Sequence, residues 1–359
     1  MTPRPSPLLW AIPLFAMACH AADGHVSTIA GSGQPGFHDG RGGEAAFNLP
    51  GALAVATDGT IYVADTFNHA VRRVTPDGLV STIAGTGMLG YLDGPGSVAT
   101  FNVVAGIALD EAAQVLYVAD SQNQLIRRID LATGTVSTFA GAASSPGLVD
   151  GALADARFDQ PYHLALDSAS STLWIADKQN NAVRAIDLRT ATVRTVAGGG
   201  DPGFADGVGA AARFSAPSGV AVDGAGGVFV TDSPNTVIRH VSADGTVTTV
   251  AGVASRPGYM NGPASAARMA FPWGIAVAAD GSVVFADRFN NVIRGLSART
   301  VTTVVGSPWS GSSLTGAPPR TDGSMSEAVL WLPTAVAIGP SGSLFVTDAS
   351  SLRRFDRSP

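Results

Sequence analysis

The feature that most constrains the fold is an internal repeat. Six copies of a short module recur along the 359-residue chain, each with an aspartate after Ala or Thr and an arginine five or seven residues later. The aspartates lie 55, 57, 55, 55 and 61 residues apart, and a steady period of this order is the sequence signature of a repeat architecture. The repeated residues are Asp65, Asp120, Asp177, Asp232, Asp287 and Asp348, with Arg72, Arg127, Arg184, Arg239, Arg294 and Arg353.

Two further markers also occur six times. One is a glycine that closes a short β-type run, and the other is an Asp-Gly pair or its Asn-Gly variant. Since three independent markers agree, chance similarity does not explain the repeat. The closing glycines are Gly31, Gly85, Gly141, Gly198, Gly252 and Gly306, and the pairs begin at Asp39, Asp93, Asp150, Asp206, Asn261 and Asp322.

Each copy contains four short apolar runs, rich in Val, Ile and Thr and bounded by turn residues, which predicts strands and not helices. In the fourth copy the runs cover residues 219–222, 227–231, 237–241 and 247–251. Asp-Gly pairs between runs are typical of hairpin turns. We therefore predict an all-β fold, a six-bladed β-propeller of four-stranded antiparallel blades.

The two ends of the repeat predict how the ring closes. The last copy has only three runs, at residues 335–338, 344–347 and 352–355, whereas an unassigned run at 26–30 precedes the first copy. Pairing the run at 26–30 with the last copy completes the sixth blade and leaves no open blade edge.

The repeat can be compared with known families. Its Gly-Ile-Ala-Val run, glycine turn and Val-Ala-Asp-x-x-Asn-x-x-Ile-Arg module resemble NHL-repeat propellers, and the match runs from residue 26 to residue 355. The resemblance implies the propeller fold. It leaves function open, because such propellers serve as protein-binding or RNA-binding surfaces, extracellular sensors and, in relatives, lyases or lactonases.

The first 22 residues resemble an export signal, followed by a propeller domain over 23–359. Arg4 supplies the basic start, residues 8–18 are apolar, and Ala16-Met17-Ala18 fits a cleavage site. We expect an extracytoplasmic protein, periplasmic or secreted and monomeric, with no transmembrane span. Cys19, the only cysteine, is either removed with the signal or lipidated as in a lipoprotein, and a single cysteine allows no disulfide within the chain.

Composition and motifs narrow the function. A net charge of -6 argues against nucleic-acid binding, which needs a basic face. No G-x-S-x-G or H-E-x-x-H motif is present. No cofactor is predicted, and the residues expected at the channel offer no carboxylate to support a divalent cation there. These observations favour a protein that is not an enzyme.

The repeated Asp and Arg residues are interpreted as framework, because a feature present in every blade usually builds the blade. The Asp oxygens are expected to cap turn amides and the Arg heads to pair with acidic or carbonyl oxygens. A long connection carries each Asp-Gly pair, and we expect the six connections to build a raised collar on the face that binds ligands.

Function is better sought where the six-fold pattern breaks. At the expected channel mouth, four aligned positions are small, whereas Tyr162-His163 and Trp273 are large and belong to blades that are not neighbours. They either plug the channel or form a ligand pocket with aromatic walls and a titratable group, His163. Further candidate ligand-binding aromatics, all in loops, are Phe67, Phe289 and Trp309.

The sequence is therefore compatible with two functions. The first is an exported binding module for a protein, peptide or glycan on the long-loop face. The second is a lyase or lactonase acting on a small molecule at the channel mouth, with His163 as the candidate catalytic acid or base. A cell-surface sensor ectodomain fits less well, because no membrane span follows the repeat.

Overall fold

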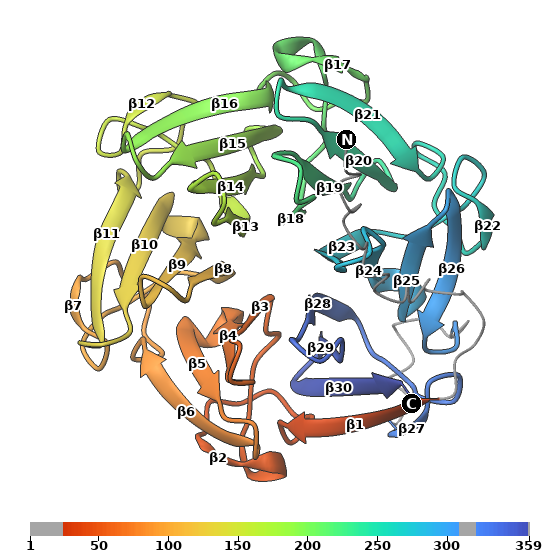
Figure 1. Cartoon of the computed structure of the whole chain (residues 1–359). Coiled ribbons are helices and arrows are strands. Elements are labelled where there is room, and N and C mark those ends of the chain that lie inside the picture. Colours follow the sequence, from red (N-terminus) through yellow and green to blue (C-terminus); the bar gives the residue numbers. More distant parts are fainter. Residues whose placement is uncertain (1–23, 309–320, 358–359) are drawn as a thin grey trace, which may run out of the picture.

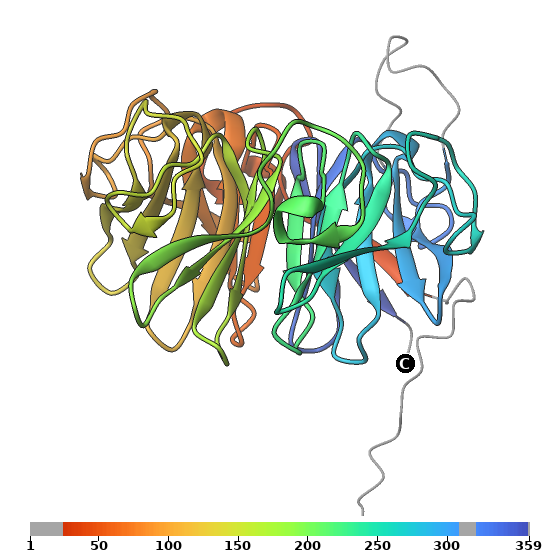
Figure 2. The ribbon, with the colours of Figure 1, turned by 90° about the horizontal axis from the view of Figure 1, so that it is seen from above.

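A computed structural model describes residues 24–308 and 321–357 and confirms the predicted six-bladed β-propeller. Figure 1 looks along the central axis and shows the blades arranged in a ring; the side view in Figure 2 shows a thick disc with strands running between its two faces. The predicted export signal, Cys19 and Trp309 lie outside the described residues. In the part of the chain that the structure describes, no helix has the length and apolarity that a membrane crossing requires.

Each blade is a five-stranded antiparallel sheet whose first long strand lines the axis. Blade one contains β2 (Gly40–Arg41), β3 (Ala52–Val55), β4 (Ile61–Asp65), β5 (Ala70–Val74) and β6 (Leu79–Ala84). Blade two contains β7 (Gly94–Pro95), β8 (Val104–Asp110), β9 (Val115–Asp120), β10 (Leu125–Asp130) and β11 (Thr135–Gly141). Blade three contains β12 (Gly151–Ala152), β13 (Pro161–Asp167), β14 (Thr172–Asp177), β15 (Ala182–Asp187) and β16 (Thr192–Gly198).

The other three blades repeat this order. Blade four contains β17 (Gly207–Val208), β18 (Gly219–Val222), β19 (Val228–Asp232), β20 (Val237–Val241) and β21 (Thr246–Ala251). Blade five contains β22 (Gly262–Pro263), β23 (Pro272–Val277), β24 (Val283–Asp287), β25 (Val292–Ser297) and β26 (Thr300–Val305). Blade six contains β1 (Gly24–Ala30), β27 (Gly323–Ser324), β28 (Pro333–Ile338), β29 (Leu344–Asp348) and β30 (Ser351–Arg357). Short 3₁₀ helices are η1 (Gly42–Glu44), η2 (Thr66–Asn68), η3 (Ser121–Asn123), η4 (Gly209–Ala211) and η5 (Arg288–Asn290).

The ring closes as the sequence predicts. Strand β1 pairs antiparallel with β30, with Gly24 opposite Arg357 and Val26 opposite Phe355. Figure 1 shows the two strands side by side in blade six. The first and last strands of the propeller thus share one sheet.

The fifth strand of each blade was not predicted. It is two residues long, starts at the glycine of the Asp-Gly or Asn-Gly pair, and pairs with the outermost long strand, as β2 does with β6. This placement corrects the expected collar, because part of every long connection runs along the outer edge of a blade. The added strand also covers an otherwise open sheet edge.

The core lies between blades and not inside them, because a single sheet buries an apolar face only against a neighbour. Six clusters of buried side chains each join two adjacent blades. The cluster between blades two and three, for example, brings Val115 and Tyr117 together with Phe158, Leu164 and Leu173. This packing holds the inner strands at fixed positions around the axis.

Candidate functional site

The repeated Asp and Arg form a buried network, shown here for blade one. Both side chains are fully buried, and Arg72 Nη1 lies 2.6 Å from Asp65 Oδ2. Asp65 also accepts hydrogen bonds from the Asn48 amide at 2.8 Å and from Asn68 Nδ2 at 2.8 Å. The other Arg72 nitrogen reaches Asp39, the aspartate of the Asp-Gly pair, at 2.7 Å. One network thus joins the long connection that carries Asp39 and Asn48, the loop between β4 and β5, and these two strands.

Equivalent networks occur around the ring, with two deviations. In blade five Asn261 replaces the Asp of the Asp-Gly pair, so Arg294 pairs with one carboxylate, that of Asp287, and not with two. In blade six the module asparagine is absent, and Arg353 pairs with Asp348 and Asp322. Burial raises the pKa of five module aspartates to about 6, although their Arg and Asn partners favour the charged form; these are Asp65, Asp120, Asp177, Asp232 and Asp287.

This network also positions the channel mouth. In blade three Asp177 Oδ1 accepts the amide of Asp159 at 2.9 Å, and the next residue, Gln160, has a left-handed backbone with φ 52°. In blade five Asp287 Oδ1 accepts the amide of Ala270 at 2.7 Å. In both blades the turn fixed by this hydrogen bond leads into the inner strand. The residue at the mouth lies three positions after the bonded amide, at Tyr162 in blade three and at Trp273 in blade five.

Tyr162 of blade three and Trp273 of blade five are in contact at this mouth. Their ring centroids lie 5.3 Å apart in a T-shaped arrangement, and Trp273 is 8% exposed. Blade four lies between them and contributes small residues. A Cβ on Gly219 would lie 2.3 Å from the Trp273 carbonyl oxygen, which accepts the Thr231 hydroxyl at 2.6 Å. The backbone of Trp273 is therefore fixed by its close packing on Gly219 and by the hydrogen bond from Thr231.

Two cations that sequence reasoning missed complete the cluster. Lys178 Nζ lies 4.5 Å from the Tyr162 ring centroid and 5.1 Å from that of Trp273. Arg288 Cζ lies 4.8 Å from the Trp273 ring centroid. A signal was present in the sequence, because the residue after the module aspartate is small in the other four blades, namely Thr66, Ser121, Ser233 and Ala349.

The described residues give these two cations no carboxylate partner. No ion pair joins Lys178 or Arg288 to a carboxylate within residues 24–308 and 321–357. Burial lowers the pKa of Lys178, and the charge of Arg288 lowers it further. Burial also lowers the pKa of Arg288, although that group stays charged at neutral pH. The mouth therefore carries positive charge against aromatic faces.

His163 directly follows Tyr162 in the chain, but its ring has a different environment. Its ring is buried against blade four, and Nδ1 lies 3.2 Å from the Val220 carbonyl oxygen. Burial lowers the pKa of His163 to about 4, so the ring is neutral at pH 7. No carboxylate bonds to His163, and no three His, Cys, Asp or Glu residues gather to hold a metal ion, anywhere in the described ranges.

The loop aromatics divide into two groups. Phe289 is 54% exposed and packs on Phe271 at 4.8 Å between centroids, and Phe271 stacks at 6.4 Å from Trp273. Phe289 therefore extends the aromatic surface of the mouth. Phe67 is 51% exposed in blade one and has no ring contact with another described aromatic residue.

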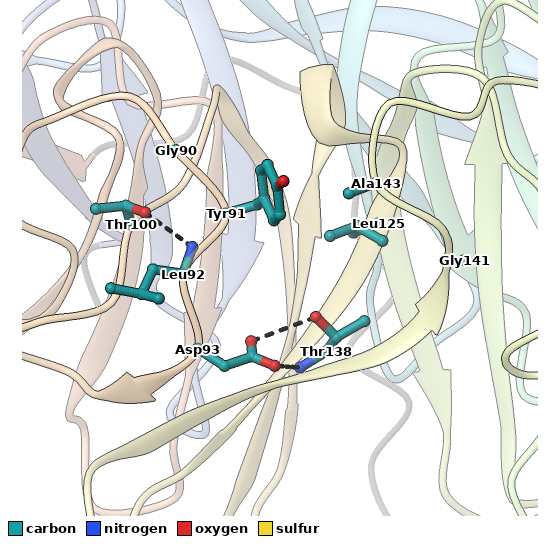
Figure 3. Close-up of a pocket in the computed structure, with 9 residues that line it drawn as sticks. All are labelled: Gly90, Tyr91, Leu92, Asp93, Thr100, Leu125, Thr138, Gly141 and Ala143. Atoms are coloured by element: carbon teal, nitrogen blue, oxygen red, sulfur yellow. Dashed lines mark hydrogen bonds between the residues drawn. The ribbon is translucent and has the colours of Figure 1, made fainter.

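A separate hollow of about 630 Å³ lies at the outer edge of blade two (Figure 3). Tyr91 is 57% exposed beside it, whereas its counterparts Phe37, Phe204 and Tyr259 stack over framework arginines. Asp93 in the hollow accepts the Thr138 amide at 3.0 Å and pairs with Arg127. Because its carboxylate already has these partners, the hollow offers a mainly apolar surface. We place the candidate site at the charged mouth.

Comparison with known proteins identifies the class. Residues 24–135 match the family model described as the Teneurin NHL domain. The chain is 29% identical over 316 residues to NHL repeat-containing protein 2 of Bos taurus, a match that covers 79% of this chain and 43% of that protein. With the six-bladed structure, these matches place the chain among the NHL-repeat β-propellers.

A second relative is protein SUPPRESSOR OF QUENCHING 1, chloroplastic, of Arabidopsis thaliana. It is 32% identical over 284 residues, which cover 75% of this chain and 27% of that protein. The chain thus spans less than half of the length of either relative.

Solved structures support the fold. An auxiliary nutrient binding protein from Bacteroides thetaiotaomicron superposes with a TM-score of 0.70 at 15% identity, covering 94% of this chain and 77% of that one. A gluconolactonase from Xanthomonas campestris superposes with a TM-score of 0.56 at 14% identity, covering 88% and 87% of the two chains. At such low identity the likeness concerns the fold alone, and binding proteins and enzymes both share it.

Proposed function

We propose that this propeller is a binding module that takes part of a protein, peptide or glycan at the channel mouth on its long-loop face. The observation that carries the proposal is the cluster of Tyr162, Trp273, Lys178 and Arg288. All four break the six-fold pattern, and all four come from blades three and five. Framework contacts repeat in every blade, so a cluster confined to two blades is better explained by a ligand.

Several features support binding over catalysis. Aromatic and arginine side chains are the groups enriched at binding hot spots. His163, the candidate acid or base, is buried, neutral at pH 7 and bonded to a backbone carbonyl. A general base must reach the proton that it removes. The export signal predicted over residues 1–22 would place this binding module outside the cytoplasm.

The test uses arrays of peptides and oligosaccharides probed with the labelled propeller. Trp273→Thr gives blade five the residue that blade six has at the same position, so the variant should fold. We expect the wild type to bind a subset of the array and Trp273→Thr to lose that subset. Tyr91→Ser, which alters the outer hollow, is the matched control and should keep it. An unchanged pattern with Trp273→Thr would refute the mouth as the binding site.

The enzyme alternative rests on the shared fold of the gluconolactonase. It predicts turnover of candidate lactones that His163→Gln abolishes. Such a result would replace the binding role with a catalytic one.

A further inference from the structure

The two mouth cations, which are partly buried, differ from the framework arginines of the propeller. Each of the six framework arginines forms an ion pair with at least one module aspartate, as Arg184 does with Asp177 at 2.8 Å. Lys178 and Arg288 directly follow two of these aspartates in the chain but form no such pair among the described residues. A partly buried cation is costly without a counter-charge.

Both cations also gather at one ring. Lys178 Nζ and Arg288 Cζ lie 5.1 Å and 4.8 Å from the Trp273 centroid, although like charges in a partly dry site repel each other. The aromatic faces offset part of this repulsion, since a cation is attracted to the face of such a ring. An anion placed between the two cations would offset the remainder.

The surroundings indicate what the anion is attached to. Phe271 and Phe289 continue the aromatic surface outward from Trp273, and Phe289 is more than half exposed. A ligand that enters here meets the positive charges of Lys178 and Arg288 and, beside them, an apolar aromatic surface. The guanidinium of Arg288 presents paired donors that match the two oxygens of a carboxylate.

We propose that the mouth between blades three and five is a carboxylate-binding site, which holds the anionic end of a ligand whose neighbouring part is apolar. Lys178 and Arg288 supply the charge, and Tyr162 and Trp273 supply the wall. This inference rests on the proposed binding function and adds the chemical class of the ligand.

The experiment is a calorimetric titration with three matched probes. 3-Phenylpropanoate carries the carboxylate, 3-phenylpropanamide is its neutral analogue, and phenyl phosphate tests a different anion. We expect the carboxylate to bind at least about tenfold more tightly than the amide, a difference of about 1.4 kcal/mol, because hydrogen bonds between charged groups are stronger than those to a neutral amide. It should also bind more tightly than phenyl phosphate.

Variants test the assignment to the two cations. Lys178→Ser and Arg288→Ser restore the small hydroxyl found in blades two and four, so each should fold and each should weaken carboxylate binding about tenfold or more. Arg194→Ser is the control, since it removes one exposed positive charge from the outer strand β16 of blade three. It should leave the affinity unchanged.

The outcomes separate the two proposals. Equal binding of carboxylate and amide, both lost in Trp273→Thr, would overturn the carboxylate inference and support the mouth as a binding site. Tighter binding of phenyl phosphate would overturn the choice of carboxylate. Failure of all probes, together with an array pattern that Trp273→Thr does not change, would overturn both proposals.

Discussion

Blade five provides a sharp test of the buried ion-pair network. In blade four Arg239 pairs with two carboxylates, Asp232 at 2.9 Å and Asp206 at 2.8 Å. In blade five Asp287, at 2.7 Å, is the one carboxylate paired with Arg294 among the residues that the structure describes, and both side chains are fully buried. Loss of the module aspartate should therefore leave the buried arginine without a carboxylate partner in blade five but not in blade four.

The perturbation is Asp→Asn at the module position, which removes the charge and keeps the shape. Removing one partner of a buried pair costs about 3–5 kcal/mol, because the other charge stays buried. We expect Asp287→Asn to lower the free energy of unfolding by this amount. Asp232→Asn should lose about 1.5–3 kcal/mol, the value of a charged hydrogen bond, because Asp206 still compensates Arg239.

The assay is urea unfolding at pH 8, where the module aspartates with a pKa of about 6 are charged. Urea is preferred because it is uncharged and leaves the ionic strength unchanged during the titration. Fluorescence and circular dichroism transitions should coincide before a single free energy is derived. Asn261→Asp should restore a second carboxylate and recover part of the loss in Asp287→Asn. Equal losses in the two blades, or no recovery with Asn261→Asp, would refute the reasoning.

Three other predictions follow from the inner ring. Gly219→Ala should lower the melting temperature in a thermal melt, because its Cβ would lie 2.3 Å from the Trp273 carbonyl oxygen; an unchanged value would mean that the inner strands can move apart. The wild type should lose stability between pH 6.5 and pH 4, because its unfolded histidine takes up a proton that the buried ring, with a pKa of about 4, does not. His163→Gln should reduce this loss by up to about 3 kcal/mol in urea unfolding measured across that pH range. The same dependence of stability on pH in both proteins would count against this burial effect. Asn291→Ala should cost about 1–3 kcal/mol in urea unfolding, because it leaves the Leu332 amide without its 2.8 Å acceptor and places alanine at φ 57°, and a neutral result would argue against this link between blades five and six.

Much of the fold could be predicted because the information repeats. Blade number and strand order depend on patterns seen several times along the sequence, and ring closure follows from the one copy that lacks a run. The outer strands were missed for a physical reason: a two-residue strand such as β2 has no periodicity of its own and forms only because β6 presents an open edge. The collar expectation was wrong in part for the same reason.

The sequence singles out two of the four residues of the proposed mouth cluster. Tyr162 and Trp273 were found because they are large where the aligned residues are small. The sequence analysis does not single out Lys178 and Arg288, because both lie inside the repeated module, which predicts framework residues. Comparison of the module position by position would have found both. Their contact with Trp273 depends on the anchored turns and the ring geometry, which the sequence does not state.

The pairing of β1 with β30 has a consequence for how the molecule is made. During synthesis the blades can form in order, but before β30 is produced β1 can pair only with the two-residue strand β27. Every shorter chain therefore leaves two unpaired sheet edges, and such edges invite aggregation. Ring closure therefore distinguishes a full-length propeller from a truncated one. A chain that stops before β30 keeps these exposed sheet edges, whatever number of blades it has folded.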